Sequence, residues 1–329
     1  MNIQSWSPIR RFFYDTFRVL HIILTLVLIL SVWFHLKPSA PQMLNYLYTC
    51  IAIWGAERLA RIIRLIILNT SGTIGLIEAL PGESCRITIT RSWLARPQQS
   101  VYLYLPRISL LQSHPFSIAW VSQADHNTRA AMENQYQLSF IVRARTGMTR
   151  QLYKTAVTAP NKTIKTTCLI EGPYGARHSL ESFGTIVLFA GGVGITHQLL
   201  CVRDLITGCN NGTNAAQRIC LVWSVQCAEH FEWIRPWIAK IWAMDMQGGV
   251  LSILLFVSKS AHRDVPFYPL IEVRDGRPDV GQLLTLEQEQ QVGAMMVSVC
   301  GPGGLGDEVR HAVRRLQTRS SIDFVEEIF

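Results

Sequence analysis

The sequence is poor in charged residues, which make up 16% of its 329 residues, whereas 49% are hydrophobic. This balance excludes a disordered chain, and it is unusual for a soluble enzyme without a lipid-facing part. No basic run interleaved with aromatic residues occurs beyond residue 70, so the net charge of +8 does not indicate nucleic-acid binding. We therefore expect membrane lipid, and no nucleic acid, among the partners.

Paired cysteines of the metal-binding or redox type are also lacking. The eight cysteines contain no CxxC motif and no zinc-finger spacing, so we expect reduced thiols in a cytosolic compartment. The N-terminal residues show no short apolar core followed by a small-residue cleavage site, which predicts no cleavable signal peptide. Insertion into a membrane would then depend on internal helices.

Two apolar segments near the N-terminus suit such helices. Residues 19–36 give about 18 nearly uninterrupted apolar positions, roughly 27 Å of helix, which predicts a transmembrane span. A second helix is expected after the turn KPSAPQ. Residues 43–56 would be its lipid-embedded half, and the rest would emerge as a basic amphipathic helix at the headgroups. Arginines lie at both outer ends of this hairpin, which places both ends in the cytosol. They are Arg10, Arg11, Arg18, Arg58, Arg61 and Arg64.

The first apolar segment carries two histidines, His21 and His35. A separation of 14 residues on a helix brings them within about 40° of each other and about 21 Å apart along the axis. One interpretation is a pair of interfacial histidines that hydrogen-bond to neighbouring helices. The other is axial ligation of two haems stacked across the bilayer, because imidazole is a good iron ligand. The sequence contains no second pair of this kind.

From about residue 71 the pattern changes to alternating stretches, at 75–90, 99–109, 135–145 and 166–175, which predict a small antiparallel barrel. Between them lies SHPFSIAW. Ser117 there suits a hydrogen bond to a ring nitrogen, with His114 and Phe116 packed against the ring edge. The alternative is an ordinary loop on the barrel surface.

Two further motifs suit phosphate groups. Gly147 and Thr149 of RTGMTRQLY lie where a helix should begin, with Arg143, Arg145 and Arg150 nearby, which favours a pyrophosphate over a simply capped helix with a solvated basic face. In TIVLFAGGVGIT, a buried strand leads into a glycine-rich turn and then a helix. The turn and the helix start consist of Gly191, Gly192, Gly194 and Thr196. Because the spacing is not GxGxxG, this motif by itself indicates a generic nucleotide site.

Strands and helices alternate through the last 150 or so residues, which predicts a parallel sheet with right-handed crossovers. The expected strands include 185–189, 218–226 and 250–258, and the segment 294–316 reads as strand, Gly-Pro turn and helix. Ligands bind such sheets at the carboxyl ends of the strands. Both glycine-rich turns, at 190–196 and 300–304, fall there.

The motifs occur in an order that resembles the ferric reductase and NADPH oxidase family, most closely its fungal ferric/cupric metalloreductases. They are the paired helix histidines, HPFS, TGMT, EGPYG, AGGVGIT, GRPD, CGPGG and FVEEIF. The resemblance implies a membrane α-helical hairpin joined to a ferredoxin-reductase-like module. Residues 1–70 would be the transmembrane segment, 71–180 an antiparallel β-barrel FAD domain, and 181–329 an α/β parallel-sheet NADP-binding domain.

The resemblance also assigns residues to FAD. Those that would hold the flavin ring, with Ser117 near its N5, are His114, Pro115, Phe116 and Ser117. Those that would bind the FAD pyrophosphate are Arg143, Gly147 and Thr149. Phe329 would be the C-terminal aromatic ring that shields the flavin until nicotinamide displaces it.

A second group would serve NADPH. The turn into the nicotinamide lobe would be Gly172, Pro173, Tyr174 and Gly175. The NADPH phosphates would lie against Gly191, Gly192, Gly194 and Thr196, and the nicotinamide beside Cys300, Gly301 and Pro302. Family members often have an arginine after the strand VWxV where this sequence has Gln226, so Arg277 is the residue expected to supply charge for the 2′-phosphate.

Family members carry electrons from NADPH through FAD and two bis-histidine haems b to an acceptor across the membrane. The implied acceptor is a ferric or cupric chelate, and the implied location is the plasma membrane with the FAD and NADPH domains in the cytosol. The family has further helices before the one with His21, including the second pair of haem ligands. The resemblance therefore implies an N-terminally truncated chain, in which a partner chain or dimer supplies the missing ligands. Superoxide formation, direct reduction of a soluble acceptor, and an inactive or regulatory subunit without haem remain alternatives.

Overall fold

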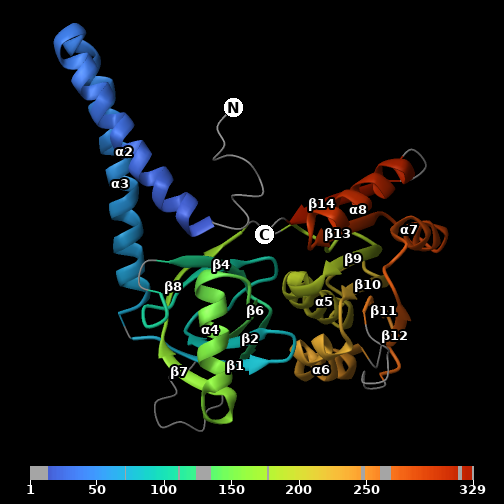
Figure 1. Ribbon diagram of the computed structural model, residues 1–329. Helices are drawn as coiled ribbons and strands as arrows, with labels where there is room; N and C mark the ends of the chain where they lie inside the picture. The colour runs from blue at the N-terminus through green and yellow to red at the C-terminus, as the bar shows by residue number, and fades with distance from the viewer. Residues whose placement is uncertain are drawn as a thin grey trace.

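The computed structural model describes residues 14–70, 72–109, 112–123, 135–175, 178–245, 249–259, 268–317 and 321–327. Figure 1 shows a helical hairpin that projects from a lobe of antiparallel strands, with a lobe built on a parallel sheet beside it. We call residues 74–174 the antiparallel lobe and residues 185–327 the parallel lobe.

The hairpin consists of α2 (Tyr14–Ser39) and α3 (Leu44–Leu68), joined by the short helix η2 (Pro41–Met43). Within the described residues, Val19–Ser39 is the one helix that is long and apolar enough to cross a membrane. Its length and composition fit the predicted first span. The second helix does not pass the same test. The helices touch through the Trp33 indole, whose Nε1 donates to the Tyr48 hydroxyl oxygen at 3.0 Å.

The antiparallel lobe has a five-stranded sheet in the order β5-β6-β2-β1-β7 and a three-stranded sheet in the order β4-β3-β8. Inward-facing residues alternate along β2, where Cys85, Ile87 and Ile89 are buried, as the period of a half-buried strand requires. The strands are β1 (Ile74–Leu80), β2 (Ser84–Arg91), β3 (Ser100–Tyr104), β4 (Ser113–Ser117), β5 (Trp120–Gln123), β6 (Tyr136–Arg143), β7 (Thr163–Thr167) and β8 (Leu169–Tyr174). Helix α4 (Gly147–Thr158) packs on this lobe, and η3 (Pro160–Lys162) follows it.

The parallel lobe has six strands in the order β12-β11-β10-β9-β13-β14, all paired in parallel. They are β9 (Thr185–Gly191), β10 (Arg218–Val225), β11 (Leu251–Val257), β12 (Ile271–Asp275), β13 (Met295–Cys300) and β14 (Ile322–Glu327). Helices cover both faces, so every residue of the central strands β9 and β13 is buried. The helical segments are η4 (Gly192–Gly194), α5 (Ile195–Asn210), η5 (Ala228–Trp233), α6 (Arg235–Asp245), α7 (Val280–Glu289) and α8 (Gly303–Leu316).

The two lobes share a tightly packed boundary. Trp120 of β5 stacks on Trp237 of α6, with ring centroids 5.8 Å apart and an interplanar angle of 8°. The Trp233 indole donates to the Pro81 carbonyl oxygen at 2.9 Å, which ties η5 to the β1–β2 turn. Hydrophobic residues of one lobe enter the core of the other, including Trp120 and Leu200. A boundary of this kind holds the two lobes in one arrangement.

Several predicted elements need correction. The stretch 75–90 forms two strands, β1 and β2, because Pro81 and Gly82 make a turn within it. The motif SHPFS forms strand β4, so the alternative of an ordinary surface loop is wrong. The segment that contains FVEE, interpreted as part of a tail, pairs with β13 as strand β14. Strand β12 was missed.

Candidate functional site

The two glycine-rich turns meet at the carboxyl edge of the parallel sheet. A Cβ added to Gly194 would lie 2.0 Å from the carbonyl oxygen of Cys300, and one added to Gly191 would lie 2.4 Å from Cδ of Pro302. Gly301 in turn approaches Gly191 so closely that a Cβ there would lie 2.9 Å from its backbone nitrogen. Glycine is thus required for the two backbones to touch. The sequence predicted that Gly191, Gly194 and Gly301 contact ligands. The structure shows that they also allow the two glycine-rich turns to pack against each other.

Gly192 is the glycine of this turn that faces open space. Its φ is +54°, a left-handed conformation that favours glycine, and no atom lies within 4 Å of the position of a Cβ. Its carbonyl oxygen accepts a hydrogen bond from the Trp223 indole at 2.9 Å, while the Thr196 hydroxyl donates to the carbonyl of Val193 at 2.9 Å. The turn is therefore held by these hydrogen bonds and is open above Gly192, the first residue of η4, which leads into α5 at Ile195. This arrangement fits a nucleotide phosphate.

Strand β3 lies between the predicted flavin motif HPFS and the motif EGPYG, which was predicted to lead into the nicotinamide lobe. Ser100 pairs with Ser117 of β4 on one side and with Tyr174 of β8 on the other. Two strand spacings separate Ser117 from Tyr174, about 10 Å, although they are 57 positions apart in the chain. Ser117 is buried, Pro115 is exposed, and His114 and Phe116 are half-buried with ring centroids 6.4 Å apart.

The sequence did not identify Glu171 as a site residue, although it belongs to the EGPYG motif. Its carboxylate is buried and accepts hydrogen bonds from the hydroxyls of Tyr104 and Tyr174, both at 2.7 Å. Arg61 of α3 donates to both carboxylate oxygens, at 2.9 and 3.0 Å. Burial raises the pKa of Glu171, but the hydrogen bonds from Arg61, Tyr174 and Tyr104 outweigh it, so that the pKa falls below its ordinary value.

This cluster changes the interpretation of the α3 arginines. They were predicted to lie among lipid headgroups, but Arg61 binds Glu171 and Arg64 donates to the Tyr174 hydroxyl at 3.3 Å. Arg61 also lies over the Tyr102 ring, 5.6 Å from its centroid. The hairpin is thereby anchored to the EGPYG motif, so the position of the membrane-proximal helix depends on the fold of the antiparallel lobe.

Gly147 begins α4, as predicted, and its φ is +56°. The Thr149 hydroxyl already serves the loop, since it accepts from the Arg145 backbone N–H at 3.0 Å and donates to the Thr146 carbonyl at 3.1 Å. No side chain caps the first amides of α4. Those amides and the half-buried Arg143 supply donors and positive charge that fit a pyrophosphate.

Cys300 ends β13 and its side chain is buried. Burial raises the pKa of this thiol to about 12, so the sulfur stays protonated near neutral pH. A buried neutral thiol is a poor nucleophile. A neutral, polarizable sulfur of this kind fits the predicted place of Cys300 beside the nicotinamide.

Two predicted site residues, Arg277 and Phe329, remain to be placed. Arg277 is exposed and follows strand β12. Strand β11 lies between β12 and β10, the strand that precedes Gln226. Phe329 lies outside the residues that the structure describes. Glu327, the last described residue, pairs with Cys300 across β13 and β14.

The residues on the hairpin do not complete a haem site. His21 and His35 are both exposed on α2, and Phe17 stacks on His21 with ring centroids 5.9 Å apart. Each of two haems would need a second axial ligand, and α3 contains no histidine. Within the described hairpin, each predicted haem therefore has one ligand.

Acid is expected to weaken the parallel lobe through His197 of α5. Burial, with a smaller effect of His178, lowers the pKa of His197 from 6.5 to about 4. Between these values the unfolded chain binds a proton that the native state does not, so lowering the pH from 6.5 to 4 should cost about 3 kcal/mol of unfolding free energy. Denaturant unfolding at several pH values measures this.

His197→Gln should remove the part of the acid loss that His197 causes, about 3 kcal/mol, and leave the part caused by buried His230, whose pKa is also lowered to about 4. H311Q, at an exposed histidine on α8, should leave the whole acid loss intact. An equal acid loss in His197→Gln and the unmodified chain would contradict the assignment.

Comparison with known proteins agrees with this geometry. A family model described as an FAD-binding domain matches residues 76–178, and one described as a ferric reductase NAD binding domain matches residues 183–266. A probable cell surface ferric reductase, kap2, of Aspergillus oryzae is 29% identical over 244 residues, 71% of this chain and 32% of that protein. The ferric/cupric reductase transmembrane component 2 of Saccharomyces cerevisiae is 23% identical over 99% of this chain and 48% of its own length. The chain thus spans less than half of these relatives.

Solved structures share the fold. The CS-b5R domains of human Ncb5or in the NAD⁺ form superpose with a TM-score of 0.54, 15% identity, and coverage of 77% of this chain and 68% of that one. A flavohemoglobin from Malassezia yamatoensis gives a TM-score of 0.51 at 16% identity, with 99% and 76% coverage. The predicted ferredoxin-reductase-like combination of an antiparallel and a parallel lobe is confirmed.

Proposed function

Because the chain belongs to the ferric reductase family, we propose that it is a membrane-bound flavin oxidoreductase that moves electrons from NADPH through FAD to ferric or cupric ion. The observation that carries this proposal is the junction of the lobes, where η4 of the glycine-rich turn lies against strand β6 of the antiparallel lobe. A hydride donor held at the turn and an acceptor held on the antiparallel lobe would meet there, as proximity requires.

In this proposal the division into domains follows the predicted limits, 1–70, 71–180 and 181–329. His114, Pro115, Phe116 and Ser117 hold the flavin ring, and Arg143, Gly147 and Thr149 its pyrophosphate. When bound, flavin accepts a hydride and releases electrons singly. Ser117 offers a hydroxyl, buried at the end of β4, that donates a hydrogen bond to a ring nitrogen. The Thr149 hydroxyl forms hydrogen bonds within the loop, so Thr149 contributes to the pyrophosphate site by shaping the start of α4. Arg143 supplies the positive charge.

On the nucleotide side, Gly191, Gly192, Gly194 and Thr196 form the phosphate turn. Gly172, Pro173, Tyr174 and Gly175 lead into the lobe boundary, and Cys300, Gly301 and Pro302 flank the nicotinamide. Arg277 favours NADPH over NADH by pairing with a 2′-phosphate. Phe329 would cover the flavin in the absence of nicotinamide, as the resemblance to the family implies.

The hairpin sets the orientation that we propose. Arg61 and Arg64 bind the antiparallel lobe, so the lobe lies on the side of the membrane where α3 ends, which is the cytosol of a plasma-membrane protein under the positive-inside rule. His21 and His35 provide one side of two haem b sites, and a partner chain or second copy provides the other. A regulatory subunit without haem is the second candidate, favoured by the single histidine per site on the hairpin.

An absorption spectrum of the chain purified in detergent tests the function. We expect a bound flavin band that NADPH bleaches, and reoxidation of that flavin by a ferric chelate. A reducible Soret band would indicate haem completed by a partner or dimer. Arg143→Ala should reduce the flavin content, whereas Arg314→Ala, on the exposed end of α8, should not. A preparation that is folded but binds no flavin would refute the proposal.

A further inference from the structure

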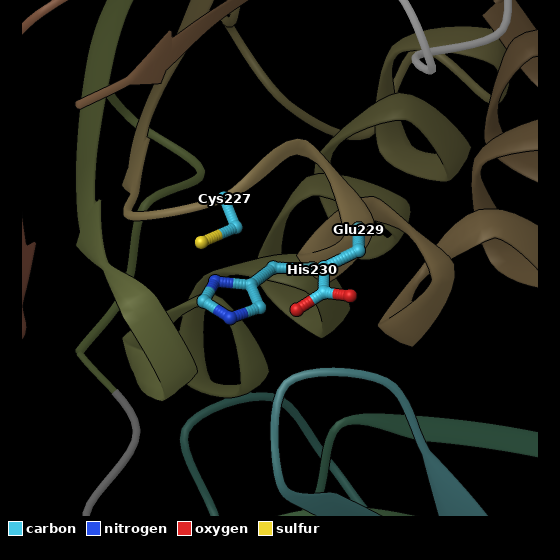
Figure 2. Close-up of side chains that lie close together, drawn as sticks. All are labelled: Cys227, Glu229 and His230. Carbon is cyan, nitrogen blue, oxygen red and sulfur yellow. The ribbon is translucent and has the colours of Figure 1, made fainter. Parts of the chain in front are cut away.

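A cluster of three metal-ligating side chains lies outside the sites considered so far. Cys227, Glu229 and His230 belong to the segment that follows strand β10, and their ligand atoms all lie within 4.8 Å of one another. Figure 2 shows the imidazole ring between the sulfur and the carboxylate, with one ring nitrogen turned towards the sulfur. The sequence spacing gave no indication of this cluster, because it matches no zinc-finger pattern.

The histidine is built into the fold in a way that leaves one nitrogen available. The side chain of His230 is 97% buried and stacks on Trp233 with ring centroids 4.3 Å apart. A Cβ on Gly82 would lie 2.4 Å from Nε2, so the β1–β2 turn covers that edge of the ring. The other nitrogen, Nδ1, is buried and has no hydrogen-bond partner among the residues that the structure describes. A buried polar atom left unsatisfied is costly, and here a metal ion would satisfy it.

The charges around the cluster also suit a divalent metal. Arg143 adds positive charge near the cluster, but the Glu229 carboxylate and a metal-bound Cys227 thiolate together supply two negative charges. This balances a divalent ion.

We propose that Cys227, Glu229 and His230 form a binding site for a divalent transition metal of the zinc type, a site separate from the proposed electron-transfer function. A sulfur and an imidazole nitrogen exclude magnesium and calcium, which prefer oxygen ligands. Ligand atoms around tetrahedral zinc lie about 3.3–3.8 Å apart, so small side-chain rotations close the cluster. The described residues supply three ligands, which leaves the fourth position to water.

The location gives the ion a structural consequence. Cys227 directly precedes η5, and Trp233 at the end of η5 binds Pro81 of the antiparallel lobe. An ion on Cys227 and His230 fixes η5 in the conformation that makes this contact. Metal binding should therefore raise the melting temperature of the chain.

Cobalt(II) titration of the flavin-loaded, tag-free full chain in detergent tests the proposal. We expect about one cobalt per chain, with a near-ultraviolet thiolate charge-transfer band, visible bands of a tetrahedral site, displacement by zinc and release of protons. Cys227→Ser should abolish the charge-transfer band. It should also weaken binding by more than the roughly 10–100-fold that loss of an outer partner costs.

Glu229→Gln should weaken binding but keep the band, because the carboxylate is exposed and its loss leaves both other ligands in place. His230→Gln should behave like Cys227→Ser if it folds. Cys50→Ser, which removes an exposed thiol on α3, is the matched control and should bind as the unmodified chain does. Absence of the band in the unmodified chain, or its persistence in Cys227→Ser, would overturn the proposal.

Discussion

Arg61→Met is expected to destabilise the antiparallel lobe by about 3 kcal/mol, because it removes the cation from a buried carboxylate. Glu171 lies inside the fold with a side chain 2% exposed, and Arg61 is its only charged partner among the described residues. The hydroxyls of Tyr104 and Tyr174 still donate to the Glu171 carboxylate in this variant. The loss of stability should therefore lie at the lower end of the range for broken buried ion pairs. Flavin-monitored or tryptophan-monitored unfolding in denaturant measures it.

The pH dependence separates this charge effect from lost packing. The pKa of Glu171 lies below its ordinary value in the folded chain, so its stabilising effect is present above the unfolded pKa and disappears as the pH falls through the folded one. The difference in unfolding free energy between Arg61→Met and the unmodified chain should therefore become smaller in acid. The double variant Arg61→Met/Glu171→Gln should recover part of the loss at pH 7.

Arg58→Met is the matched control, since Arg58 lies on the same helix, is exposed and pairs with its neighbour Glu57. A surface pair of that kind contributes little, and its loss should leave the stability of the lobe unchanged. If Arg58→Met and Arg61→Met were equally destabilised, the anchoring of α3 through Glu171 would be wrong.

Gly194→Ala is expected to cost about 3 kcal/mol or more and to abolish nucleotide binding. The new Cβ would lie 2.0 Å from the carbonyl oxygen of Cys300 and 2.6 Å from its carbonyl carbon. Both atoms are backbone within β13, so no side-chain rotation relieves the overlap, and the two turns must separate. Separation moves Gly192, the residue that faces the open phosphate position.

Two measurements follow from this. Unfolding in denaturant gives the loss of stability, and titration of NADP⁺ against flavin or tryptophan fluorescence gives the loss of binding. Gly281→Ala, in the first turn of α7, is the control, because its Cβ would make one ordinary contact at 3.5 Å with Asp279. Retention of both stability and NADP⁺ binding in Gly194→Ala would show that the turns do not pack as described.

Sequence reasoning was reliable where the signal is local. The apolar run at Val19–Ser39, the helix start at Gly147 and the strand–turn–helix around Gly191 each depend on neighbouring residues, and the structure contains all three. For the motif that contains His114 and Ser117, the sequence left open whether the segment is an ordinary surface loop. Pairing with β3 decides that SHPFS is a strand, and a partner strand cannot be read from five residues.

The sequence alone determined the class of the protein. Periodicity, the glycine-rich turns and the order of the motifs predicted a lipid-facing helix, an antiparallel lobe and a parallel nucleotide-binding lobe, because each of these signals is carried by residues close together in the chain. The tertiary structure alone decided which distant residues meet. Arg61 reaches Glu171 across 110 positions, Gly194 meets Cys300, and Gly82 lies against the His230 ring. Such contacts arise from the packing of whole elements, which no local pattern encodes.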